Sequence, residues 1–232
     1  VNPANTRVQQ AYSSGEVQAL ISHSAGHKLE LFVFLTIVFG LRKGEALGLQ
    51  WKDFDFENGS FLVARSRSER KYQDAEGRVR TLISNGETKT QSSIRTLPIT
   101  PGLSALLMSQ QERNLSFGSG NQLSDQVIIG ERGGPISLRR VEDGVKRLMT
   151  DAGLRRIRIH DFRHTSAELA LQNEARLEEV SEALGHTGVD VTKRIYAPRV
   201  PQLANGFAQK IEHSLGLGFD SYPGVQAAEG VN

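Results

Sequence analysis

The chain has 232 residues, no cysteine and a formal net charge of only +2 at neutral pH. The lack of cysteine excludes disulfides, thiolate nucleophiles and cysteine metal sites, and it suits a reducing cytoplasm. No apolar run approaches the roughly 18 residues that a membrane helix needs, and no secretory signal opens the sequence. We therefore expect a globular cytoplasmic protein of one large or two small domains, with no membrane partner.

The first fifty residues show helical patterns. Residues 1–12 are predicted to be a linker, and the capping box Ser13-x-x-Glu16 predicts a helix that reaches about Ser24. Apolar residues at helical spacing predict a central core helix over Lys28–Phe39. Gly40 ends this helix, and a short helix is expected over Arg42–Leu49.

The pattern then changes to alternation. Apolar residues that alternate around Asn58-Gly59 predict a β-hairpin. The polar stretch Arg65–Gly77 is predicted to be an exposed loop. Two further strands are expected over Val79–Ile83 and Ile94–Pro98, with Lys89 near the hairpin tip between them. The sequence thus predicts a small antiparallel sheet.

The second half is mainly helical, which makes the expected class α+β with a majority of helix. Gly185 is a left-handed stop for one of its helices, and a following helix is expected to carry Tyr196 near its end. The tail from Gly216 is predicted to be flexible. The other predictions are a short strand over Val127–Ile129 and helices from Pro101 to about Arg113, after Ser137 to about Asp151, His160 to about Gln172, Leu177 to Leu184 and Pro201 to Leu215.

Cationic residues gather in two segments. One interpretation is a surface that follows the phosphates of a nucleic acid. The other is a pair of solvated faces balanced by neighbouring acids. The charge pattern alone leaves both open. The clusters are Arg65, Arg67, Arg70, Lys71, Arg78, Arg80, Lys89 and Arg95, then Arg139, Arg140, Lys146, Arg147, Arg155, Arg156, Arg158 and Arg163.

Several residue types in this chain suit phosphoryl transfer. Two arginines can grip the non-bridging oxygens of a phosphodiester. A tyrosine can form a covalent phosphoryl bond, while a histidine and a lysine move the protons. Any one of these residues alone is more often structural, and Tyr12, Tyr72 and Tyr222 are equally available phenols.

Five short motifs, taken in order, resemble the catalytic domain of tyrosine recombinases, the phage-integrase family, from residue 14 to about 200. The resemblance implies a mostly helical fold with a small antiparallel sheet. It also implies DNA cleavage through a 3′-phosphotyrosine, without metal, cofactor or ATP, by a tetramer on paired sites. The motifs are Gly40-Leu41-Arg42-Lys43-Gly44-Glu45-Ala46-Leu47, Thr88-Lys89-Thr90 with Ser93-Ile94-Arg95-Thr96-Leu97-Pro98, His160-Asp161-Phe162-Arg163-His164-Thr165, Leu184-Gly185-His186, and Tyr196.

The resemblance also assigns roles by position. Tyr196 would be the nucleophile, and Arg42 and Arg163 would clamp the scissile phosphate. Lys89 would be the general acid toward the 5′ oxygen. The remaining positions are His160 as the acid/base partner, His186 as a hydrogen-bond donor to the phosphate, Glu45 as the acidic residue that orients the site, and His164 as a packing residue behind it.

Family members usually carry an N-terminal helical DNA-binding domain, and nothing before Ser13 could supply it. We expect an isolated catalytic domain over residues 13–200 that binds DNA weakly and with strong salt dependence. The C-terminal segment, residues 201–232, resembles the part that members dock onto a neighbouring subunit; folding back onto its own domain is an equal alternative. Accessory DNA-bending proteins are further expected partners.

Three other functions stay open. A type IB topoisomerase shares the tyrosine chemistry and needs no partner subunit. His160, His164 and His186 could form a metal site, although the H-E-x-x-H pattern is absent. The third alternative is a DNA-binding regulator without catalytic activity.

Overall fold

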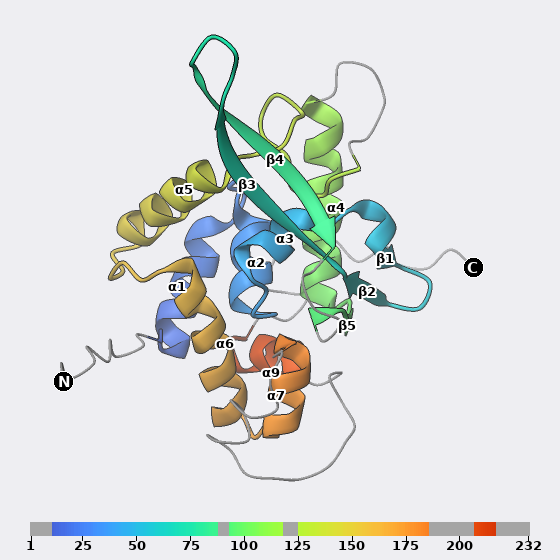
Figure 1. Ribbon diagram of the computed structural model, residues 1–232. Coiled ribbons are helices and arrows are strands. Elements are labelled where there is room, and N and C mark those ends of the chain that lie inside the picture. The colour runs from blue at the N-terminus through green and yellow to red at the C-terminus, as the bar shows by residue number, and fades with distance from the viewer. Residues whose placement is uncertain (1–10, 88–92, 118–124, 186–206, 217–232) are drawn as a thin grey trace, which may run out of the picture.

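The structure is a computed structural model that describes residues 11–87, 93–117, 125–185 and 207–216 (Figure 1). Its described helices are α1 (Ser14–Ser24), α2 (Glu30–Ile37), α3 (Lys43–Gly48), η1 (Trp51–Asp53, a 3₁₀ turn), α4 (Pro101–Phe117), α5 (Leu138–Asp151), α6 (Ile159–Gln172), α7 (Leu177–Leu184) and α9 (Phe207–Ser214). Its described strands are β1 (Phe54–Asp55), β2 (Ser60–Val63), β3 (Arg65–Gln73), β4 (Val79–Glu87) and β5 (Arg95–Pro98). The predicted α+β class, mainly helical with antiparallel sheets, is confirmed.

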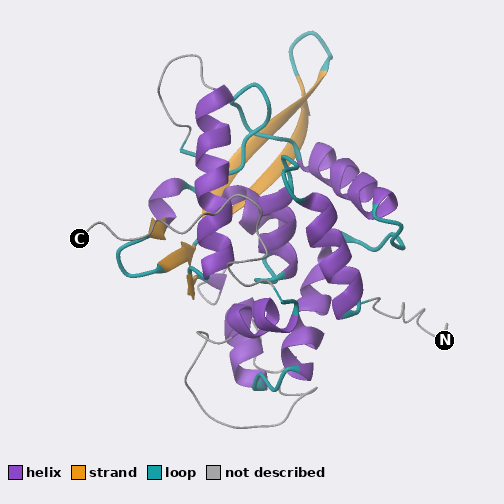
Figure 2. Ribbon diagram, turned by 180° about the vertical axis from the view of Figure 1, so that it is seen from behind, coloured by secondary structure: helices purple, strands orange, loops and turns teal. Residues whose placement is uncertain are grey.

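Helix α2 is the centre of the hydrophobic core. All 8 of its residues are buried, and α1, α3, α4 and α6 pack around it. Figure 2 shows the same helices from behind, with α6, α7 and α9 together at the lower end of the molecule. Among the described residues, no helix combines the length and the apolar character that crossing a bilayer requires.

The three-stranded sheet has the order β1-β2-β5. In the predicted hairpin, Phe54 lies opposite Phe61, and Gly59 in its turn has a φ of 61°. Strand β5 pairs with the other edge of β2, with Phe61 opposite Leu97. Phe61 and Leu97 are buried, so the sheet turns one face toward the core.

The prediction of an exposed loop over Arg65–Gly77 is wrong for residues 65–73, which form β3, and holds only for the turn at residues 74–77. Strand β3 pairs with β4 along its whole length, from Arg65 opposite Glu87 to Gln73 opposite Val79, and the hairpin projects beyond the helices (Figure 1). The inward position at Arg67 carries a guanidinium, 2% exposed, which donates to Asn85, Gln126 and the Ile136 carbonyl. A polar residue at an inward position hides the apolar alternation that predicts a strand.

Other local predictions also differ from the structure. The expected hairpin between residues 79–83 and 94–98 does not form, because β4 pairs with β3 and β5 pairs with β2, in separate sheets. Residues Val127–Ile129 form no strand but isolated bridges at their borders, Gln50 with Gln126 and Ile129 with Pro135. The expected linker is partly docked, because Tyr12 is 3% exposed and its backbone N–H donates to Thr165 Oγ1 at 3.0 Å. Residues 1–10 lie outside the described part of the chain.

In the second half of the chain, the helix caps at Ser137 and Gly185 lie where the sequence predicts them. Ser137 Oγ accepts a hydrogen bond from the Arg140 N–H at the start of α5, and Gly185 ends α7 with a φ of 60°. Helix α4 continues to Phe117, beyond its predicted end. The predicted helix that carries Tyr196 lies outside the described residues, as do 201–206 and the tail from 217 onward.

Helix α9 lies against α6 and α7 of its own chain. Ile211 and Leu215 are buried, and the Leu215 carbonyl accepts a hydrogen bond from Gln18 Nε2 of α1. Lys210 Nζ lies 3.5 Å from Glu179 Oε2 on α7. The described part of the C-terminal segment thus packs on the helices of its own chain, while docking onto a second subunit stays a prediction.

A buried carboxyl group makes this packing pH-dependent. Glu212 is 5% exposed, and burial raises its pKa from 4.5 to about 7, against hydrogen bonds from Thr100 and the Gly102 backbone that lower it. Because the folded pKa is raised, the stabilisation is complete below the ordinary glutamate pKa and is lost as pH rises through about 7. We expect the free energy of unfolding to fall by roughly 2–3 kcal/mol between pH 5 and pH 8 from this group.

Urea unfolding of the wild type and of Glu212→Gln across this pH range measures the effect. The amide keeps the hydrogen bonds but does not titrate, so the variant should lose most of the decline. An equal pH slope in both proteins would show that Glu212 is not the titrating group.

Candidate active site

Helix α3 begins at the first arginine of the proposed site. Arg42 is its N-cap residue, and Glu45 reaches back to it with both carboxylate oxygens. Oε2 accepts the Arg42 backbone N–H at 3.0 Å, and Oε1 pairs with Arg42 Nη1 at 2.6 Å. The Arg42 side chain keeps 36% of its exposure, whereas that of Glu45 keeps 2%. The buried Glu45 carboxylate therefore holds the Arg42 guanidinium in place while part of the Arg42 side chain stays exposed to solvent.

The second arginine comes from α6. Arg163 is 3% exposed, and it donates through Nη1 to the Gly40 carbonyl at 2.9 Å and through Nη2 to the Leu184 carbonyl. Burial lowers the pKa of Arg163 to about 9, and the positive charge of Arg42 adds to this shift. The guanidinium still carries its charge at neutral pH.

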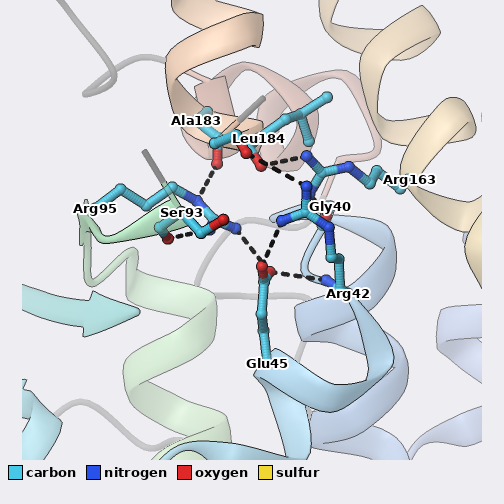
Figure 3. A network of polar contacts seen from close by, with 9 residues as sticks. Gly40, Arg42, Glu45, Ser93, Arg95, Arg163, Ala183 and Leu184 are labelled. Carbon is cyan, nitrogen blue, oxygen red and sulfur yellow. Dashed lines mark hydrogen bonds and ion pairs between the residues drawn. The ribbon is translucent and has the colours of Figure 1, made fainter. Parts of the chain in front are cut away.

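The C-terminal turn of α7 holds the arginines together. Its last carbonyls each accept from a different guanidinium: Ala183 from Arg95 at 2.6 Å and Leu184 from Arg163 (Figure 3), and Gly185 from Arg42 at 3.3 Å. The final carbonyls of a helix have no partner inside it, and the negative end of the helix dipole attracts cations. This turn can therefore collect three like charges around the single carboxylate of Glu45.

Glu45 stays ionised in this setting. Burial would raise the pKa of Glu45, but the charge and hydrogen bond of Arg95, together with those of Arg42, hold it below its usual value. The cluster of three guanidinium groups and one carboxylate has a formal excess of two positive charges. Such an excess, held in place before an anion arrives, is what an oxyanion-stabilising site requires.

Arg95 is the residue of this cluster that the sequence analysis missed. The sequence places it in a cluster of cations, yet its side chain is 5% exposed and pairs with Glu45 at 3.0 Å. The available signal was its place in a strand, since Arg95 and Leu97 face inward while Thr96 faces solvent. A charged residue at an inward strand position needs a buried partner.

The two histidines of α6 lie edge to face, with ring centroids 5.3 Å apart. Desolvation, the other imidazole and Arg163 lower the pKa of His160, and desolvation is also the largest cause of the lowered pKa of His164. His160 is exposed and His164 is partly exposed, whereas Arg163 on the same helix is buried. An exposed, neutral imidazole can accept a proton from a bound substrate or nucleophile.

Three residues of the predicted site lie outside the described residues: Lys89, His186 and Tyr196. The structure brings Arg42, Glu45 and Arg163 together, and His160 stands about one turn before Arg163 on the same helix. Gly185, the residue before His186, is part of the cluster.

One competing phenol is excluded as a ready nucleophile. Tyr12 is buried, its hydroxyl donates to the Arg155 carbonyl, and desolvation raises its pKa to about 12. Tyr72 is 49% exposed but lies on the projecting β3–β4 hairpin.

Among the described residues, no three His, Asp or Glu side chains are grouped as metal ligands would be.

Many cations of the two charged segments have partners within the protein. Arg65 pairs with Asp53, and Arg78 and Arg80 both pair with Asp74. Arg155 pairs with Glu16 and Arg158 with Asp161. Local balance therefore explains part of each cluster, as the second interpretation of the charge pattern expected.

Solved structures with a similar fold are DNA integrases and recombinases. The Tn1549 transposon integrase, solved in complex with transposon right end DNA, gives a TM-score of 0.67 at 19% identity and covers 86% of this chain and 65% of its own. The XerA recombinase gives 0.60 at 18% identity and covers 88% and 64%. At these identities the likeness establishes the fold alone.

Sequence relatives and a family model identify the protein family. The chain is 30% identical over 200 residues to the tyrosine recombinase XerC-like protein of Caldanaerobacter subterraneus subsp. tengcongensis, covering 83% of this chain and 51% of that protein. It is 28% identical over 219 residues to the ICEBs1 integrase of Bacillus subtilis, covering 92% and 57%. The model of the phage integrase family matches residues 13–201, so this chain belongs to that family. It spans about half the length of these curated relatives.

Proposed function

We propose that this chain is the catalytic domain of a site-specific DNA recombinase. The observation that carries the proposal is the meeting of Arg42 and Arg163 at the end of α7, where their guanidinium groups donate to successive carbonyls. Two planar forks that are charged at neutral pH match the non-bridging oxygens of one phosphodiester. Membership of the phage integrase family supports this function.

The proposed reaction is a transesterification. The Tyr196 hydroxyl attacks the scissile phosphorus, and its proton passes to His160. The bond from phosphorus to the 5′ oxygen breaks, and Lys89 gives that oxygen a proton. The products are a 3′-phosphotyrosyl bond and a free 5′-OH. A 5′-OH from a second strand then reverses the steps, so the ester is conserved and ATP is not needed.

The described residues supply the electrostatics of this reaction. Arg42 and Arg163 stabilise the charge that develops on the non-bridging oxygens, and their positive charge fills the role of a metal ion. The proposal adds His186, which lies outside the described residues, as a further donor. Glu45 holds Arg42 in place. The lowered pKa of His160 leaves its imidazole free to take the phenolic proton, and His164 packs edge-on against it.

The proposed partners are double-stranded DNA, three further copies of the protein on paired sites, and accessory DNA-bending proteins. The location is the bacterial cytoplasm, in keeping with the bacterial relatives. These relatives are a recombinase and an integrase, which favours recombination over the type IB topoisomerase alternative.

Covalent capture tests the proposal. The chain is incubated with a pool of nicked duplexes of randomised sequence, in which a cleaved short fragment diffuses away and traps the intermediate. We expect a denaturation-resistant protein–DNA adduct that peptide mapping places on Tyr196 and that Tyr196→Phe abolishes. An adduct on Tyr72 or Tyr222 would refute the assignment of the nucleophile, and the lack of any adduct would refute the proposed function.

A further inference from the structure

Arg95, the first residue of β5, is the buried centre of the network in Figure 3. Its three nitrogens donate to three separate segments. Nε bonds the Ala183 carbonyl at the end of α7 at 2.6 Å, Nη1 bonds the Ser93 carbonyl ahead of β5 at 3.2 Å, and Nη2 pairs with Glu45 Oε2 on α3 at 3.0 Å. One side chain therefore joins the helix of Arg42, the turn that precedes residue 186, and the segment that precedes β5.

Glu45 connects Arg95 with Arg42. Its Oε1 accepts Arg42 Nη1 at 2.6 Å, while its Oε2 accepts both Arg95 Nη2 and the Arg42 backbone N–H at 3.0 Å. The position of this carboxylate thus depends on both arginines. Because Arg95 is buried and the Arg42 side chain is 36% exposed, Arg95 is the fixed partner and Arg42 the one that can reach a ligand.

The turn after α7 is also built on Arg95. A Cβ atom at Gly185 would lie 3.0 Å from Arg95 Nη1 and 3.2 Å from Arg95 Cδ. The backbone of Gly185 therefore rests directly on the Arg95 side chain, and its carbonyl faces Arg42 at 3.3 Å. Arg95 sets the place of the second group that holds Arg42.

We propose that Arg95 is a positioning residue for DNA cleavage, acting through Glu45 and Gly185 to aim Arg42 at the scissile phosphate. This inference rests on the proposed function. Arginine suits the task because its planar fork presents donors in fixed directions and keeps its charge. A lysine would place one ammonium point on a flexible stem and could not serve three segments in this geometry.

Single-turnover cleavage of a nicked duplex recovered in the covalent capture tests the inference. We expect Arg95→Met to slow cleavage by about 100-fold and Arg95→Lys by about 10-fold, because a misplaced clamp loses the aligned geometry. The affinity for DNA should change less than about threefold, since a buried side chain does not touch it. Arg113→Met is the matched control: Arg113 also donates to a carbonyl, that of His27, and lies near a glutamate, Glu30, but on α4. It should cleave at the wild-type rate.

A second substrate separates positioning from general destabilisation. A methylphosphonate at the scissile position replaces one charged oxygen with a neutral methyl group, so a weakened cationic clamp matters less. The rate gap between the wild type and each Arg95 variant should shrink to less than about threefold. Urea unfolding shows whether the variants are folded; if Arg95→Met is not, Arg95→Lys decides the question.

The outcomes separate the inference from the proposed function. If the wild type forms the Tyr196 adduct but the Arg95 variants cleave as fast as it does, the positioning role is refuted and the recombinase function stands. A rate gap that stays undiminished on the methylphosphonate also refutes it, since the defect would then be structural. If the wild type forms no adduct, the proposed function fails and the inference falls with it.

Discussion

Arg163→Lys is expected to slow DNA cleavage by about 10²–10³-fold, the usual cost of removing one preorganised oxyanion donor. Arg163 is 3% exposed, and burial brings its pKa down to about 9. The same burial would lower the pKa of a lysine, whose ordinary value is about 10.4, below that of an arginine. The substituted side chain would therefore lose its charge at a lower pH than Arg163, which stays charged near neutral pH.

The measurement is single-turnover cleavage of the nicked duplex between pH 6 and pH 8. The variant should lose activity as pH rises, in addition to its lower rate, while the wild type should not show this decline. Arg158→Lys is the matched control, because Arg158 precedes the same helix but its side chain is 59% exposed and pairs with Asp161. Cleavage by Arg163→Lys within threefold of the wild type would show that the Arg163 guanidinium does not hold the scissile phosphate.

Locally encoded elements were predictable from the sequence. The capping residues Ser13 and Ser137 start their helices, and Gly185 stops α7 in a left-handed conformation, because each of these effects depends on a few neighbouring residues. The buried helix α2 followed from a run of apolar residues alone. Likewise the family motifs place Arg42, Glu45 and Arg163 in one cluster, as the structure does.

Partnerships between distant segments were not predictable. The guanidinium of Arg67 on β3 is buried because two groups far along the chain, the Gln126 side chain and the Ile136 carbonyl, accept its hydrogen bonds. In the sequence, Arg95 cannot be told apart from a surface cation. Its burial follows from the contacts with Glu45 on α3 and with the Ala183 carbonyl on α7. A lone cationic side chain has no local sign of burial, so its role emerges only from tertiary structure.

The link between α2 and the arginines depends on one glycine. Gly40 has a φ of 62°, its carbonyl accepts Arg163 Nη1 at 2.9 Å, and a Cβ atom there would overlap Leu184 Cδ2 and lie 3.1 Å from Ser166 Oγ. Leu184 is 2% exposed and Ser166 is fully buried, so neither can move aside easily. The core helix, the α6 arginine and the end of α7 thus meet at a point without room for a side chain.

Gly40→Ala is therefore expected to lower the free energy of unfolding by about 2–4 kcal/mol, the sum of a left-handed alanine and an overpacked contact. Gly59→Ala is the matched control, since Gly59 has a φ of 61° but nothing within 4 Å of the added methyl group. It should cost only the backbone part, about 1 kcal/mol. Urea unfolding measures both. In a double-mutant cycle, Gly40→Ala should cost less in the Leu184→Ala background than in the wild type, because the overlapping methyl group is then absent. Equal losses in Gly40→Ala and Gly59→Ala would mean that α7 does not press on Gly40, and that the arginine cluster is held less tightly than its contacts imply.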